Sequence, residues 1–229
     1  MIQRTLVTGF EPFGGDKTNP SADLALALDG SKVGRLQIIG RVLPVEYAAA
    51  GELIVEWLRE LRPAVVICTG LAASADVIRI ETVAVNEDDS PFPDNAGLLR
   101  ERSPIVSGGP RSFNSTLPTA HILDECARKK IAIESSSDAG RYVCNHVFYT
   151  LLHERLAISA GFIHLPSDLS TNETSRAIRT ILAVTIKRAH TLQRTFSRRT
   201  TTRTRRAMWC ADNLRHEQHM RLRNSVALH

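Results

Sequence analysis

Apolar segments of strand length alternate along the chain with segments in which apolar residues recur at helical spacing. The short apolar runs predict strands at residues 4–10, 36–45, 64–70, 77–85, 131–138 and 161–166. Helical spacing predicts helices at residues 21–28, 47–61, 116–130 and 173–193, and a further helix that begins at or next to Cys144. Alternation of this kind is typical of an α/β domain with a largely parallel sheet.

The segment between residues 86 and 114 breaks this alternation. It is rich in Pro, Gly, Asp and Asn, and it is far longer than an ordinary connection between two elements. Long loops on a rigid α/β scaffold usually carry functional groups or are disordered. The pattern therefore predicts either a functional or a disordered loop at 86–114.

Composition divides the chain into two parts. The 229 residues are 43% hydrophobic and 23% charged, as is usual for a globular protein. Nine arginines against Asp212 and Glu217 concentrate the positive charge, net +5 for the whole chain, in residues 194–229. That segment has no hydrophobic periodicity that could sustain a packed element. We predict one α/β domain at 1–193 and an Arg-rich, flexible extension at 194–229.

The basic extension does not by itself indicate nucleic-acid binding. Recognition of single strands combines basic residues with aromatic ones, and the extension holds only Phe196 and Trp209. Loose attraction to phosphate stays open. Cys210, His216 and His219 form a weak set of metal ligands in a polar segment. We expect neither a metal site nor specific nucleic-acid recognition.

The cysteines and the first residues indicate a reducing compartment. Cys68, Cys126, Cys144 and Cys210 show no regular spacing, and a chain of this length does not need disulfides to stabilise its core. The first ten residues lack the zones of a signal peptide, and no apolar run approaches the roughly 18 residues of a membrane span. We expect four free thiols, a cytoplasmic location and no membrane partner.

Cys144 stands where a polar turn becomes an apolar helix. Unpaired backbone N–H groups and the helix dipole favour an anion at such a position, and they can also stabilise an oxyanion. The position therefore suits a thiolate nucleophile. The alternative is a small side chain that fills space at a buried helix start, which is the commoner role of a cysteine.

A cysteine nucleophile needs a base, and the base needs an acceptor that orients it. His164 ends an apolar strand, and the carboxyl ends of strands are where open α/β sheets place their chemistry. Glu81 lies in a mostly apolar strand, where a carboxylate needs a partner. That partner is either an imidazolium or a nearby arginine such as Arg79. His146 and His153 are interpreted as structural or surface residues.

Six stretches resemble the pyroglutamyl peptidase I family, also called the pyrrolidone carboxyl peptidases. They read VTGFEPFGG, LPVEY, PDNAG, IVSGGP, YVCNH and GFIHLP, and they run in the family's order from residue 5 to about 166. The resemblance implies a phosphorylase/hydrolase-like α/β fold, a three-layer sandwich with a mixed, mostly parallel sheet flanked by helices. It implies a cysteine exopeptidase, a thiol protease that removes N-terminal pyroglutamate (5-oxoproline) from peptides.

The resemblance also assigns residues. It implies a catalytic triad of Cys144, His164 and Glu81, the residues already favoured on chemical grounds. It implies substrate contacts at positions 10, 13, 71 and 143, which hold Phe10, Phe13, Leu71 and Val143. Without it, an aromatic pair that packs a loop against the core explains the two phenylalanines equally well. The family further implies no metal, no cofactor and a cytoplasmic homotetramer.

Two positions depart from the family pattern. Leu71 stands where the family has a glutamine, and Pro91 stands where it has an arginine. A lost amide leaves its partner unpaired in a desolvated pocket, which costs about 1–3 kcal/mol. Arg79, Arg100 and Arg102 are the candidates to replace the missing positive charge.

Two other functions therefore stay open. The first is an amide or lactam hydrolase that uses the same triad on another small acyl group. The second is a non-enzymatic protein that keeps the fold and whose basic extension binds an acidic partner or nucleic acid.

Overall fold

The computed structural model describes residues 4–189 of the chain. Its strands are β1 (Arg4–Phe10), β2 (Lys32–Val33), β3 (Leu36–Leu43), β4 (Val65–Leu71), β5 (Ile78–Glu81), β6 (Val83–Val85), β7 (Ser112–Asn114), β8 (Ile133–Ser136) and β9 (Ser159–Leu165). Its helices are α1 (Pro20–Leu28), α2 (Tyr47–Leu61), α3 (Thr119–Arg128) and α4 (Val143–Glu154), followed by helical residues 171–189. The predicted extension at 194–229, which includes Cys210, lies outside the described residues. No helix within 4–189 is long and apolar enough to cross a membrane.

Seven strands form one mixed sheet in the order β2-β3-β1-β4-β9-β5-β8. The pairs β3-β1, β1-β4, β4-β9 and β5-β8 are parallel, whereas β2-β3 and β9-β5 are antiparallel. Strands β6 and β7 form a separate antiparallel pair. The prediction of a mixed, mostly parallel sheet is confirmed.

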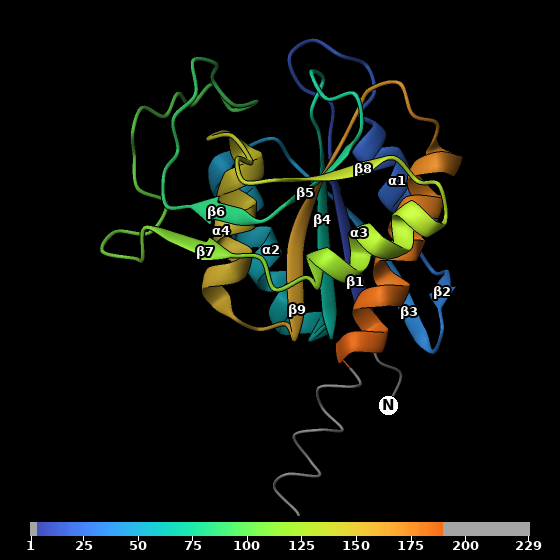
Figure 1. Ribbon diagram of the computed structural model, residues 1–229. Helices are drawn as coiled ribbons and strands as arrows, with labels where there is room; N and C mark the ends of the chain where they lie inside the picture. Colours follow the sequence, from blue (N-terminus) through green and yellow to red (C-terminus); the bar gives the residue numbers. More distant parts are fainter. Residues whose placement is uncertain (1–3, 190–229) are drawn as a thin grey trace, which may run out of the picture. The chain divides into compact units, whose positions relative to one another are not determined.

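Helices cover both faces of this sheet (Figure 1). Successive side chains of a strand point to opposite faces, so each central strand contributes to two cores. Helices α2 and α4 pack on one face, where Leu6, Val66 and Phe162 are fully buried. Helices α1 and α3 and residues 177–182 pack on the other, where Val7 and Ile67 are buried. The result is the three-layer α/β sandwich expected from the resemblance.

The single strand predicted at 77–85 is wrong. Its first part is β5 in the large sheet, and its last part is β6 in the small one. The chain leaves the large sheet because Asn145 of α4 binds the next strand, accepting a hydrogen bond from Val85 N–H (3.0 Å) and donating one to the Val85 carbonyl (2.9 Å). Hydrophobic periodicity cannot reveal a capture of this kind by a side chain sixty residues away.

The loop predicted at 86–114 is held by hydrogen bonds and contains the short strand β7, which was not predicted. Asp88 and Ser103 exchange both backbone hydrogen bonds, at 2.7 and 2.9 Å. The side chain of Asn86 donates to the Val106 carbonyl and accepts from its N–H, both at 2.8 Å. The loop also supports the start of α4, because the Tyr142 hydroxyl donates to the Pro93 carbonyl (3.0 Å).

Candidate active site

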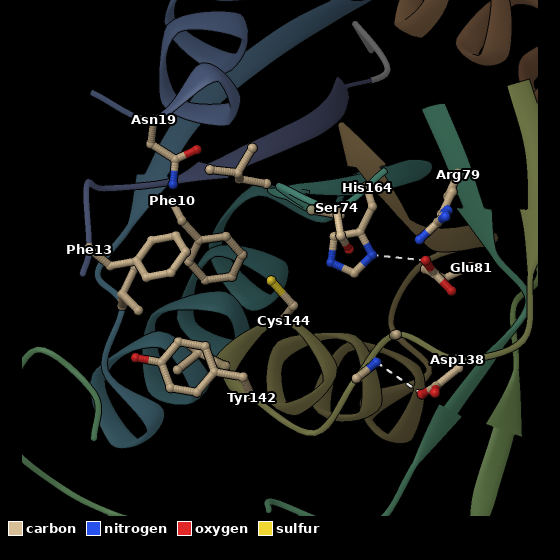
Figure 2. A pocket seen from close by; sticks show the side chains of 16 residues that line it. Phe10, Phe13, Asn19, Ser74, Arg79, Glu81, Asp138, Tyr142, Cys144 and His164 are labelled. Atoms are coloured by element: carbon tan, nitrogen blue, oxygen red, sulfur yellow. Dashed lines mark hydrogen bonds and ion pairs between the residues drawn. The ribbon is translucent and has the colours of Figure 1, made fainter. Parts of the chain in front are cut away.

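A cavity of about 310 Å³ opens near the carboxyl ends of the parallel strands β1, β4 and β9. The described structure brings all seven predicted site residues to its wall, namely Phe10, Phe13, Leu71, Glu81, Val143, Cys144 and His164. They come from four strands, one loop and one helix that are distant in sequence. Figure 2 shows Cys144 and His164 in the middle of this pocket.

Cys144 is the second residue of α4. The first-turn N–H groups of a helix lack intrahelical partners, and the N-cap Tyr142 supplies no side-chain hydrogen bond. The sulfur lies against β4 at Gly70, where an added Cβ would stand only 2.8 Å from Sγ. A residue without a side chain at position 70 therefore makes room for the thiol.

Cys144 differs from the other described cysteines in its exposure. It is partly accessible and lines the pocket, whereas Cys68 and Cys126 are buried. Burial raises the pKa of the Cys68 thiol to about 12 and also raises the pKa of Cys126. Among residues 4–189, only Cys144 combines access to the pocket with a place at a helix start.

His164 and Glu81 form a buried pair on neighbouring antiparallel strands, β9 and β5. His164 Nδ1 lies 2.8 Å from Glu81 Oε1, and the two side chains are 9% and 1% exposed. An ionised carboxylate accepts hydrogen bonds but cannot donate them. The imidazole therefore carries a proton on Nδ1, which leaves Nε2 as the ring nitrogen that can exchange a proton in the pocket.

Arg79 was the alternative partner for Glu81, but it pairs with Glu134 instead, with Nε 2.8 Å from Oε1. Of its two candidate partners, Glu81 therefore binds the imidazole of His164 and not Arg79.

The surroundings of His164 stabilise its protonated form. Burial disfavours the imidazolium and lowers its pKa, but hydrogen bonds and negative charge from Cys144 and Glu81 outweigh burial and raise the pKa to about 9. At neutral pH the ring is then positively charged. An imidazolium beside a thiol stabilises the thiolate, which is the nucleophilic form.

Aromatic and aliphatic side chains form the opposite end of the pocket (Figure 2). Phe13 packs against Tyr142 with ring centroids 6.1 Å apart. Phe10 is 2% exposed and packs on Phe162 at 6.4 Å, so it belongs to the core as well as to the pocket wall. Phe10 therefore packs in the core and also faces the pocket, and its contact with substrate stays a prediction. This end suits a small, flat and neutral group.

Several wall residues were not predicted. Ser74, Asp138, Gly140 and Tyr142 also line the pocket. The turn formed by Asp138 and Gly140 lies a few residues before α4, the helix that carries Cys144. This closeness in sequence to Cys144 could have indicated that the turn lines the pocket. Arg79 was named as a candidate charge, but nothing in the sequence indicated its place in the wall, because that place depends on the pairing of β5 with β9.

The structure also separates the three arginines considered as replacements for the charge absent at Pro91. Arg79 lines the pocket, and Arg100 lies over the ring of Tyr47 at 5.7 Å. Neither Arg100 nor Arg102 belongs to the pocket wall.

His146 and His153 follow the structural interpretation. His146 Nδ1 lies 2.9 Å from Asp88 Oδ2, and both side chains are buried. His153 stacks on Tyr149 at 6.1 Å. Residues 4–189 contain no cluster of three His, Cys, Asp or Glu side chains that could hold a metal ion.

Comparison with known proteins gives a consistent result. The family model described as pyroglutamyl peptidase matches residues 3–180. A pyrrolidone-carboxylate peptidase from Pyrococcus furiosus is 44% identical over 71% of this chain and 80% of its own, and one from Klebsiella pneumoniae is 36% identical over 80% and 93%.

A solved structure of a mutant pyrrolidone carboxyl peptidase from Pyrococcus furiosus superposes with a TM-score of 0.79 at 36% identity. The match covers 82% of this chain and all of that chain. Motifs, fold and pocket thus agree with the sequence comparisons, and the chain belongs to the pyroglutamyl peptidase family.

Proposed function

We propose that this protein is a cysteine exopeptidase that removes N-terminal pyroglutamate from peptides. Cys144 is the nucleophile, His164 the general acid and base, and Glu81 the residue that orients His164. The observation that carries the proposal is the shared pocket, in which an accessible thiol and a carboxylate-bound imidazole stand beside an apolar recess. Family membership gives independent support.

The chemistry follows from the roles of these groups. The Cys144 thiolate attacks the acyl carbon of pyroglutamate, and the first-turn N–H groups of α4 are available to the oxyanion. The C–N bond breaks as the imidazolium of His164 transfers its Nε2 proton to the leaving amine. His164, now neutral, takes a proton from water, and the hydroxide formed releases pyroglutamate from the thioester.

Substrate recognition is expected at the apolar end of the pocket. The lactam ring is neutral, so it needs no carboxylate to hold a free amino terminus. Phe10, Phe13 and Val143 offer it apolar contacts, and Leu71 offers bulk without a hydrogen bond. Leu71 is the residue on which a shifted acyl preference would depend.

A panel of acyl-aminomethylcoumarins tests this function against the amide or lactam hydrolase. The panel contains pyroglutamyl, prolyl, acetyl and cyclopentanoyl derivatives, and each is given to the native protein and to Cys144→Ala. We expect turnover of the pyroglutamyl derivative by the native protein alone. Preference for another acyl group would favour the rival hydrolase, and no turnover with any acyl group would favour the non-enzymatic alternative.

Assembly and compartment are part of the proposal as well. By family resemblance we infer a homotetramer that acts on pyroglutamyl peptides in the cytoplasm. Light scattering on the purified full chain measures the mass of the assembly directly. A monomer at the concentration used for the activity assay would contradict the tetramer while leaving the chemistry untouched.

A further inference from the structure

The two ends of the pocket differ in charge (Figure 2). Phe10 and Phe13 lie at one end, whereas Arg79, Glu81 and Asp138 lie at the other, with Cys144 and His164 between them. A cavity of about 310 Å³ has more room than one lactam ring needs. The charged end is therefore available to another part of the substrate.

The proposed function fixes which part that is. With the lactam at the apolar end and its acyl carbon at Cys144, the leaving amine must face His164, which protonates it. The residue that follows pyroglutamate is attached to this amine. It therefore extends past His164 toward Arg79 and Asp138.

Among residues 4–189, Arg79 is the only lysine or arginine that lines the pocket. It lies directly opposite His164 in the antiparallel register of β5 and β9, so both side chains project from the same face of the sheet. Its side chain is 34% exposed, and Nε binds Glu134, which is not part of the wall. Within residues 4–189 no other hydrogen bond of this guanidinium is found, so its two terminal NH2 groups are available.

Asp138 carries the opposite charge but is less able to select a ligand. Its Oδ1 already accepts hydrogen bonds from the Gly140 N–H (3.1 Å) and from Arg141 Nη1 (2.9 Å). Its side chain is 73% exposed, so water screens its charge more than that of Arg79. Glu81 is neutralised by the imidazolium of His164.

We propose that Arg79 is a specificity residue that binds a carboxylate on the residue following pyroglutamate. This proposal rests on the proposed function. The carboxylate is either the side chain of an acidic residue or the C-terminal carboxylate of a pyroglutamyl dipeptide. Both present the same planar anion to the guanidinium, which is shaped to bind it through two N–H groups.

Two isosteric substrate pairs separate these sources. Pyroglutamyl-glutamate amide and pyroglutamyl-glutamine amide differ only in the side-chain charge, and pyroglutamyl-alanine and its amide differ only at the C-terminus. For at least one pair we expect kcat/KM of the native protein to favour the carboxylate by about two- to fivefold, the effect of a partly exposed ion pair. In Arg79→Gln the ratio should fall to about one or below, and Arg79→Lys should retain part of it.

Arg128→Gln is the matched control, because Arg128 also pairs with a glutamate, Glu125, but lies on α3 outside the pocket. It should keep the native ratio. Glu134→Gln frees the guanidinium from its present partner and should increase the preference. Equal ratios in the native protein and in Arg79→Gln, for both substrate pairs, would overturn the proposal even though the uncharged substrates are hydrolysed.

A second readout does not need turnover. Iodoacetate and iodoacetamide have the same size and both alkylate a thiolate with loss of iodide, but only iodoacetate carries a negative charge. The ratio of their rates at Cys144, followed by mass spectrometry of the Cys144 peptide, should fall by about two- to fivefold in Arg79→Gln and stay unchanged in Arg128→Gln.

An unchanged ratio in Arg79→Gln would overturn the role of Arg79. If no pyroglutamyl substrate is hydrolysed, the proposed function fails, and this alkylation ratio still decides whether Arg79 attracts anions into the pocket.

Discussion

Replacement of Gly70 by alanine should displace the sulfur of Cys144 without substituting any residue of the triad. The new Cβ would lie 2.8 Å from Cys144 Sγ and 3.0 and 3.2 Å from the Phe162 ring atoms Cζ and Cε1. Ordinary contacts between such atoms are about 3.5–4.0 Å, so the overlap approaches 1 Å. Phe162 is fully buried and packs on Phe148 at 5.8 Å, which leaves it no room to retreat.

The side chain that can move is Cys144, because it borders the pocket. A misplacement of about 1 Å at a reacting atom can lower catalysis about 100-fold. Relief of the overlap also costs about 1–3 kcal/mol of stability. The prediction is thus a loss of kcat/KM on pyroglutamyl-aminomethylcoumarin that is much larger than any loss of folded protein explains.

Gly161→Ala is the control. Gly161 lies on the adjacent strand β9, and its added Cβ would overlap Leu117 and stand 2.7 Å from Ser115 Oγ, away from the sulfur. Urea unfolding should show that both variants lose stability, whereas kcat/KM per folded molecule should fall only in Gly70→Ala. The reasoning is refuted if Gly70→Ala stays within about threefold of the native protein, or if both variants lose activity equally.

Three further predictions concern buried or substituted positions. Folding raises the pKa of His164 from 6.5 to about 9, so protonation of the ring stabilises the folded protein fully below pH 6.5 and this stabilisation is lost as the pH rises toward 9. The Tm should therefore fall between pH 6.5 and 9, and it should fall less in His164→Gln. His146→Phe removes the imidazole whose Nδ1 lies 2.9 Å from Asp88 Oδ2 and leaves that buried acceptor without its hydrogen-bond partner, so urea unfolding should show a loss of about 1–3 kcal/mol; an unchanged free energy of unfolding would contradict a stabilising hydrogen bond. Leu71→Gln should raise kcat/KM for pyroglutamyl substrates about fivefold or more, because its amide can pair with the lactam; an unchanged value would show that other groups already do so.

Local pattern was sufficient for the elements that position the nucleophile. Helix α2 has its predicted bounds, 47–61, because its apolar stripe is continuous, and α4 begins at Val143, next to Cys144 as expected. The pattern failed where a distant side chain decides the path of the chain. Asn145 draws Val85 out of the large sheet, and no periodicity within residues 77–85 records this.

In the site, too, local pattern predicted some residues, whereas the place of others depends on distant parts of the chain. Cys144, His164 and Glu81 could be predicted because the position of each indicates a chemical role. Cys144 stands at a helix start, His164 at a strand end and Glu81 within an apolar strand. Arg79 could be named as a candidate charge, but its place in the pocket wall requires the antiparallel register of β5 and β9. Sequence reasoning could not supply that register, since both parallel and antiparallel neighbours fit the same apolar runs.

The most direct test of the central claim is to trap the acyl-enzyme. The native protein is mixed with pyroglutamyl-aminomethylcoumarin and quenched in acid within one turnover, and the site of acylation is located by mass spectrometry of its peptides. The account predicts one pyroglutamyl group on Cys144, absent in Cys144→Ala and less abundant in Glu81→Gln because acylation is slowed. Acylation of another residue, or full turnover by Cys144→Ala, would contradict it.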